Sequence, residues 1–305
     1  MATVTPTRAD RALGSRTGSG HPATAFVLPG GASLGALQVG MLHALYEHGI
    51  APDLLVATSA GALNAAFIAS RPQTTATARE LAHVWHDLDR EDVFPVRMSA
   101  LVGGLRGRRD HLVPNRALRQ LVRRYVEFDD LGDAAVPLHV VAFDLIQGRE
   151  VLLSDGPALE AIAGAASIPG VFPPVLLGER QLIDGGVVNN TPISRAVELG
   201  AERIYVLPTR ERSRPLGRVP RGALGVAIYG LGLLVDGRLE ADIARYSSEV
   251  ELIVLPAPNS RDVQPTNFEH SDRLVNEARA AARALIAPAD TVPESGLELG
   301  ILAAA

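Results

Sequence analysis

Short apolar segments with strand character alternate with longer helical segments along most of this chain. Strands are predicted at Thr24–Leu28, Asp53–Ala57 and Arg203–Leu207, with helices at Gly35–Glu47 and Ala60–Ser70. Strands separated by helices indicate βαβ units, so we expect an α/β fold with a mostly parallel sheet and helices on both faces. In such sheets the functional residues lie beyond the carboxyl ends of the strands.

The rest of the chain continues this alternation. Further helices are predicted at Thr74–Leu88, Asn115–Val126, around Leu224–Tyr246 and from about Phe268 to Ile286, and further strands at Leu138–Leu145, Arg149–Ser154, Gln181–Ile183 and Val250–Leu255. Residues 89–113 are rich in Arg and Gly and are expected to be an irregular flap. We expect one domain over residues 23–286, a disordered polar tail over 1–22 and a loosely packed tail over 287–305.

Composition excludes several kinds of chemistry. The 305 residues contain no Cys and no Lys, which removes disulfides, thiolate nucleophiles, the Walker A lysine and Schiff-base catalysis. A net charge of −5 gives no electrostatic reason to expect a nucleic-acid partner. No obvious cluster of metal ligands is present, so we expect neither a metal nor a cofactor.

Two glycine-rich junctions follow predicted strands. In the first, Gly30, Gly31, Ala32, Ser33 and Gly35 open a helix, and such a loop offers unpaired backbone N–H groups to an anion or a developing oxyanion. A dinucleotide fingerprint fits these residues poorly, because its glycine pattern is broken at Ala32 and Asp53 is the only acid near the expected offset. A tight turn without chemistry is the other interpretation.

The second junction resembles the nucleophile elbow of hydrolases. Its central Ser59 lies among small residues, Ala57, Ala60 and Gly61, as a serine on a strained turn requires. We favour Ser59 over Ser33 as the nucleophile, because four residues intervene between the first strand and Ser33. The alternative is that Ser59 only caps the following helix.

A candidate base ends a later strand. Asp184 is followed by Gly185 and Gly186, so little side-chain bulk shields its carboxylate. An ordinary Asp-Gly turn would have the same sequence. Burial among apolar neighbours would raise its pKa from about 3.9 and make it a better base.

Four segments in this order resemble the patatin-like phospholipase family: GGASLGALQVGML at Gly30–Leu42, VATSAGALNAA at Val56–Ala66, AASIPGVFPPV at Ala165–Val175, and LIDGGVVNNTP at Leu182–Pro192. The resemblance spans about Thr24 to Phe268. It implies a three-layer α/β/α fold, with 23–286 as the catalytic domain, and hydrolysis of acyl esters by a Ser59–Asp184 dyad. Amides of the Gly30–Gly35 loop would hold the oxyanion, and the substrate would be a lipid or another acyl ester.

The chain departs from the family pattern at Ala32, Leu34 and Ala57. Ala32 and Ala57 stand where the family has glycine, and Leu34 stands where many members carry Arg or Lys. The loop would donate through its backbone N–H groups, so Ala32 and Leu34 can still serve as donors if the path of the backbone is kept. An Ala57 position that needed φ > 0 would cost on the order of 1–2 kcal/mol.

Two alternatives to the dyad stay open at this point. His270 follows Ser59 and Asp184 in the chain order of α/β-hydrolase triads, although a capping or packing role suits its place before the last helix. A non-catalytic lipid-binding or acyl-binding protein could use the same scaffold.

The sequence says less about location and partners. No apolar run reaches the ~18 residues of a membrane span and the first 22 residues lack a signal-peptide core, so we expect a cytoplasmic protein. Apolar residues from Phe94 to Leu105 could line an acyl channel, and Arg106, Arg108 and Arg109 could contact anionic lipid headgroups transiently. The oligomeric state is not legible from the sequence.

Overall fold

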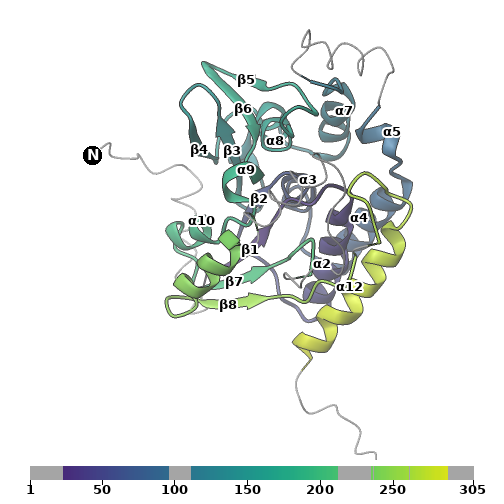
Figure 1. Ribbon diagram of the computed structural model, residues 1–305. Coiled ribbons are helices and arrows are strands. Elements are labelled where there is room, and N and C mark those ends of the chain that lie inside the picture. The colour runs from purple at the N-terminus through teal and green to yellow at the C-terminus, as the bar shows by residue number, and fades with distance from the viewer. Residues whose placement is uncertain (1–22, 96–110, 212–234, 236, 261, 288–305) are drawn as a thin grey trace, which may run out of the picture.

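A computed structural model describes residues 23–95, 111–211, 235, 237–260 and 262–287 (Figure 1). The expected tails and most of the expected flap therefore lie outside the described residues. The strands are β1 Thr24–Leu28, β2 Leu54–Thr58, β3 Leu138–Asp144, β4 Arg149–Leu153, β5 Val175–Leu177, β6 Arg180–Asp184, β7 Arg203–Val206 and β8 Glu251–Val254.

The sheet is mixed and mostly parallel, as predicted. Strand β1 pairs in parallel with β2 and β7, and the parallel set extends to β3 on one side and β8 on the other. Strands β4, β5 and β6 are antiparallel additions at the β3 end. The carboxyl ends of β1, β2 and β7 therefore meet at one edge, which is the edge where the candidate residues were expected.

Helices cover both faces of the sheet. The longer ones are α2 Ala36–Glu47, α3 Ala60–Ala69, α4 Thr75–Asp87, α7 Arg116–Tyr125, α8 Ala158–Ala165 and α12 Ser271–Ile286. Short ones are α5 Arg90–Val93, α9 Gly186–Asn189, α10 Ile193–Glu198 and the 3-10 turns η2 Ala32–Gly35 and η3 Leu131–Asp133, and residues 237–246 are also helical. The three-layer arrangement is confirmed (Figure 1).

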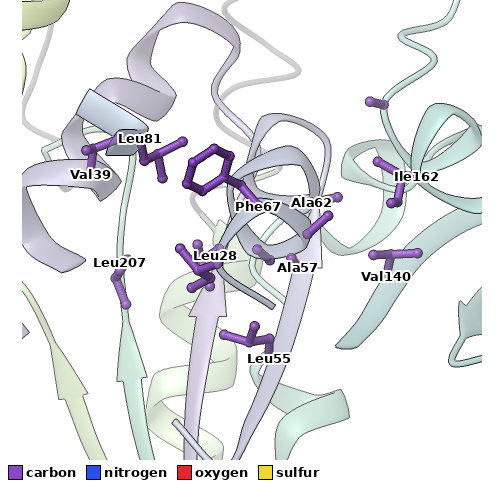
Figure 2. Close-up of a cluster of buried hydrophobic side chains, with 14 of the residues drawn as sticks. Leu28, Val39, Leu55, Ala57, Ala62, Phe67, Leu81, Val140, Ile162 and Leu207 are labelled. Atoms are coloured by element: carbon purple, nitrogen blue, oxygen red, sulfur yellow. The ribbon is translucent and has the colours of Figure 1, made fainter. Parts of the chain in front are cut away.

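Alternating strand residues build the two cores. Phe26, Leu28 and Leu55 face the large core under the longer helices, whereas Ala25 and Val27 face a smaller core with α10 and Tyr246. Figure 2 shows Leu28, Leu55 and Ala57 on the strands pointing toward Phe67 and Leu81 on the helices. Strands buried on both faces read as continuous apolar runs, which is why TAFVL and LLVAT are so hydrophobic.

Candidate functional site

Ser59 lies in the sharp turn between β2 and α3. Its backbone has φ 55° and ψ −128°, and the residue is 7% exposed. Positive φ costs a side-chain-bearing residue about 1–2 kcal/mol, and such strain clusters at functional sites. Within the described part of the chain, Ser59 and Ala32 are the two non-glycine residues with positive φ, and both belong to the predicted site.

The expected strain at Ala57 is not found. Ala57 is a fully buried strand residue that pairs with Leu28 and Val140, so its backbone is extended and a methyl group fits there. The position with φ 50° is Ala32, in the loop after β1. Of the two glycine departures, only Ala32 therefore strains the backbone.

The pairing of β3 explains how Ser59 meets Asp184. Strand β4 pairs with β3 along residues 140–144, which fills one edge of β3. On the other edge, β2 ends where Thr58 pairs with Val141, and the antiparallel β6 ends where Asp184 pairs with Ala142. The two strands meet end to end on one edge of β3, and this brings together residues 125 positions apart in the sequence.

The end of α8 supports both residues. The carbonyl of Ala165 accepts a hydrogen bond from the amide of Ser59 at 3.0 Å. Two residues later, the carbonyl of Ser167 accepts one from the amide of Asp184 at 2.9 Å. Sequence reasoning missed this role, although the AASIPG segment was one of the four that carry the family resemblance.

The Asp184 carboxylate is buried, and burial is the main influence on its pKa. Desolvation raises the pKa of Asp184 to about 6, while hydrogen bonds from the Ser59 hydroxyl and the Gly186 amide oppose the rise. The Gly186 bond to Oδ1 is 2.8 Å long. Next to it, a Cβ on Gly185 would lie 2.4 Å from the Val141 carbonyl oxygen, so glycine allows this close approach.

The five loop residues predicted as oxyanion donors differ in what their amides do. The amide of Ser33 donates to the Pro265 carbonyl at 3.0 Å, and its hydroxyl donates to the Gln264 carbonyl at 3.1 Å. Ser33 is thus already bonded through both its donors, and the predicted role for its amide is wrong. Gly35 closes the turn η2, and its carbonyl accepts from Asn64. The amides of Gly30, Gly31 and Ala32 donate no hydrogen bond to any other described residue.

His270 is not part of this cluster of interactions. It is the residue before α12, and the groups that set the pKa of Asp184 are Ser59 and Gly186 rather than His270. The geometry favours a two-residue arrangement over a triad.

An apolar pocket opens beside Ser59. Its wall includes Ala32, Ser59 and Ala60 together with side chains of α3, α4, α5 and α7. Phe94, predicted as a channel residue, lines it, whereas the other channel candidates up to Leu105 and the three arginines from Arg106 to Arg109 lie outside the described residues. In the wall, the ring of Phe94 contacts the rings of Phe172 and Phe268.

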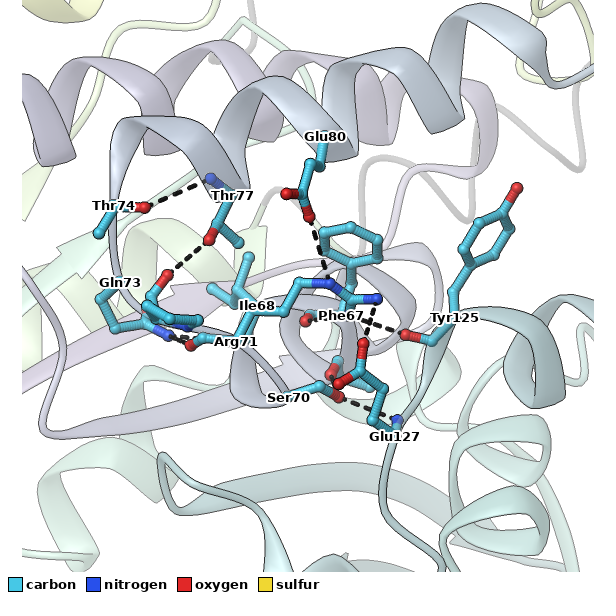
Figure 3. Close-up of polar contacts among 12 residues, drawn as sticks. Phe67, Ile68, Ser70, Arg71, Gln73, Thr74, Thr77, Glu80, Tyr125 and Glu127 are labelled. Atoms are coloured by element: carbon cyan, nitrogen blue, oxygen red, sulfur yellow. Dashed lines mark hydrogen bonds and ion pairs between the residues drawn. The ribbon is translucent and has the colours of Figure 1, made fainter.

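Arg71 holds two elements of the pocket wall together (Figure 3). Its guanidinium lies 3.9 Å from the centre of the Phe67 ring and donates to the Tyr125 carbonyl at 2.9 Å. An ion pair with Glu127 at 2.7 Å adds to this contact. Phe67 and Tyr125 both line the pocket, so Arg71 ties the end of α3 to the end of α7.

Two general features of the described residues bear on the kind of site. Nowhere among them do three or more His, Asp or Glu side chains gather as a metal ion would require. Every described helix is also too short or too polar to span a bilayer.

Comparison with known proteins agrees with the fold. A family model described as patatin-like phospholipase matches residues 26–197, more than half of the chain. An uncharacterized NTE family protein of Mycobacterium tuberculosis (strain CDC 1551 / Oshkosh) is 27% identical over 284 residues, covering 85% of this chain and 46% of that protein. Lysophospholipase NTE1 of Mycosarcoma maydis is 24% identical over 188 residues, covering 59% of this chain and 9% of that protein.

Among solved structures, VipD from Legionella pneumophila is similar with a TM-score of 0.46 and 13% identity, over 87% of this chain and 67% of that one. The chain spans less than half the length of the two curated relatives named above. The sheet order, the strained serine turn and the glycine loop after β1 define a patatin fold. The chain belongs to the patatin-like phospholipase family.

Proposed function

We propose that this protein is a lipid acyl hydrolase that cleaves carboxylic esters through an acyl-enzyme on Ser59. The observation that carries the proposal is the hydrogen bond from a strained serine, which lines an apolar pocket, to a buried carboxylate. The apolar wall suits a fatty acyl chain, and a name such as lysophospholipase among the relatives agrees with that substrate class. Family membership supports lipid hydrolysis more generally.

In the first half-reaction, the Ser59 Oγ attacks the ester carbonyl carbon while the Asp184 carboxylate takes its proton. The amides of Gly31 and Ala32 stabilise the oxygen that becomes negative. The bond to the leaving alcohol then breaks, and Asp184 returns the proton to the alcohol oxygen. A serine ester of the fatty acid remains.

In the second half-reaction, Asp184 takes a proton from water, whose oxygen attacks the serine ester. The bond to Oγ breaks, Ser59 regains its proton from Asp184, and the fatty acid leaves. Because the pKa of Asp184 is near 6 rather than 4, the carboxylate is a stronger base and is still ionised at neutral pH.

Labelling with a fluorophosphonate probe tests the nucleophile. We expect wild type and Ser33→Ala to be labelled and to hydrolyse p-nitrophenyl esters and phospholipids, and Ser59→Ala to do neither. Ser33 is a matched control because it is a buried serine in the neighbouring loop. Labelling that survives in Ser59→Ala contradicts the assignment. Lipid binding without labelling or turnover would show a non-catalytic acyl-binding protein instead.

The pH dependence of hydrolysis follows from the raised pKa of Asp184. A base must be deprotonated to act, so kcat/KM should rise about tenfold per pH unit below about 6 and level off above about 7. The profile should be recorded for wild type and for His270→Ala, because His270 is the alternative base. A midpoint near 4, or one abolished in His270→Ala, would count against Asp184 as the base.

A further inference from the structure

Two consecutive carbonyls of the loop after β1 are hydrogen-bonded from the side chains of other elements. Thr209 Oγ1, which follows β7, donates to the Gly30 carbonyl at 2.7 Å. Gln38 Nε2, on α2, donates to the Pro29 carbonyl at 2.7 Å. Thr209 is 2% exposed and Gln38 is fully buried, so water does not compete readily for either carbonyl.

A hydrogen bond to a carbonyl also fixes the following N–H group. The peptide unit is planar and trans, so the Gly30 C=O and the Gly31 N–H point in opposite directions within one rigid plane. Holding the Gly30 oxygen against Thr209 directs the Gly31 N–H away from Thr209. In the same way, the hydrogen bond from Gln38 to the Pro29 carbonyl fixes the direction of the Gly30 N–H, because both groups belong to one peptide unit.

Packing shows which side of the loop faces Ser59. A Cβ on Gly31 would lie 2.4 Å from the Thr209 Cβ, so the loop rests directly on Thr209. A Cβ on Gly30 would lie 2.7 Å from the Ser59 Cβ and 2.7 Å from Asn190 Oδ1. The loop therefore lies between Thr209 and the turn that carries Ser59. Asn190 Nδ2 adds a longer bond of 3.4 Å to the Gly30 carbonyl.

We infer that Thr209 is a positioning residue that orients the Gly31 N–H toward the oxyanion formed on the Ser59 adduct. The inference rests on the proposed function for its catalytic consequence. The role of Thr209 does not require contact with Asp184 or with the attacking oxygen, because it acts through the plane of the Gly30–Gly31 peptide. A hydrogen bond to the carbonyl also polarises the amide and makes its N–H a better donor.

Gly31 gives the loop a particular need for such an anchor. Glycine is conformationally free, and the next residue, Ala32, is strained at φ 50°. Rotation of the Gly30–Gly31 peptide, which lies between two glycines, would turn the N–H away from the reacting carbonyl. The bond from Thr209 opposes this rotation.

Three variants test the inference. Thr209→Val keeps the shape and removes the donor, Thr209→Ser keeps the donor, and Thr77→Val is the matched control. Thr77 is also a buried threonine, 3% exposed, and its hydroxyl donates to the Pro72 carbonyl at 2.6 Å (Figure 3 shows Thr77 and its bonds).

We expect Thr209→Val to lower kcat about tenfold to a hundredfold, less than the ~10²–10³-fold cost of losing a whole oxyanion donor. KM should stay within about twofold, because the donor acts mainly in the transition state. Thr209→Ser should recover most of the rate, and Thr77→Val should keep the wild-type rate with a thermal midpoint lowered as much as in Thr209→Val. An unchanged kcat in Thr209→Val, or equal losses of kcat in Thr209→Val and Thr77→Val, would overturn the inference.

Crystal structures of wild type and Thr209→Val separate this inference from the proposed function. We expect the Gly30–Gly31 peptide to rotate, or to occupy two orientations, only in Thr209→Val. If wild type hydrolyses no ester, the proposed function fails, and an unmoved peptide in Thr209→Val would then refute the inference on its own.

Discussion

Replacing Asp184 by asparagine is expected to reduce ester hydrolysis by a factor on the order of 10²–10⁴, because asparagine cannot accept the proton of Ser59. The shape of the site should persist, since the amide oxygen can still accept the bond from Gly186. Steady-state hydrolysis of a p-nitrophenyl ester measures the loss. His270→Ala is the control and should keep substantial activity. The reverse pattern would establish a triad.

The same substitution should stabilise the fold at neutral pH. The pKa of Asp184 is raised from 3.8 to about 6 in the folded state, so folding favours its protonated form. The contribution of Asp184 to the free energy of unfolding is therefore fully present below about pH 4, and it is lost as the pH rises through about 6. At 1.36 kcal/mol per pKa unit, the total loss is ~3 kcal/mol. Asparagine has no charge to bury and escapes this cost.

Urea unfolding of wild type and Asp184→Asn at pH 4.5 and pH 8 measures this effect. The variant should be clearly more stable than wild type at pH 8, and the difference should shrink at pH 4.5. A difference independent of pH would show that folding does not shift the pKa of Asp184.

Replacing Gly61 by alanine is expected to destabilise the fold by about 2–4 kcal/mol. Its Cβ would lie 2.0 Å from the Leu28 carbonyl oxygen and 2.6 Å from the Pro29 carbonyl oxygen. These are backbone atoms that no side-chain rotation can move, so α3 would have to lift away from β1. Hydrolysis should fall as well, because Ser59 begins this helix and Pro29 begins the loop opposite it.

Gly237→Ala provides the matched control for Gly61→Ala. Gly237 also lies in a helical stretch, 237–246, but beyond its own helix no heavy atom of the described residues lies within 4 Å of its would-be Cβ. Alanine there should leave stability unchanged or raise it by up to about 1 kcal/mol. Chemical unfolding and turnover are measured on both variants. Equal stability of the two would contradict the close contact between α3 and β1.

Local patterns in the sequence predicted the regular part of the fold. Strands β1, β2 and β7 and helices α2, α3 and α4 are long, apolar or well capped, and they appear where predicted. Strand β5 and helices α9 and α10 were missed because they have three, four and six residues, too few for a periodicity to show. Helix α8 was also missed: it has only eight residues and begins after Pro157 without a side-chain cap that would mark its start.

The sequence singled out the candidate residues of the site but not the way in which the fold brings them together. Ser59 and Asp184 were identified from glycine-rich turns, and the structure brings them into hydrogen-bond contact. Their meeting on one edge of β3 depends on strand pairing, which no local pattern encodes. For the same reason, the bonds that Ser33 makes to Gln264 and Pro265 were not foreseen, since they join segments more than 230 residues apart.

The bond between Thr209 and the Gly30 carbonyl spans 179 positions of the chain, which bears on the order of events during protein synthesis. A nascent chain emerges from the ribosome amino end first, and contacts this distant in sequence form late. Ser59 therefore emerges early, and Thr209, which holds the loop opposite it, emerges 150 residues later. The candidate site is therefore assembled only after this late segment has joined the sheet.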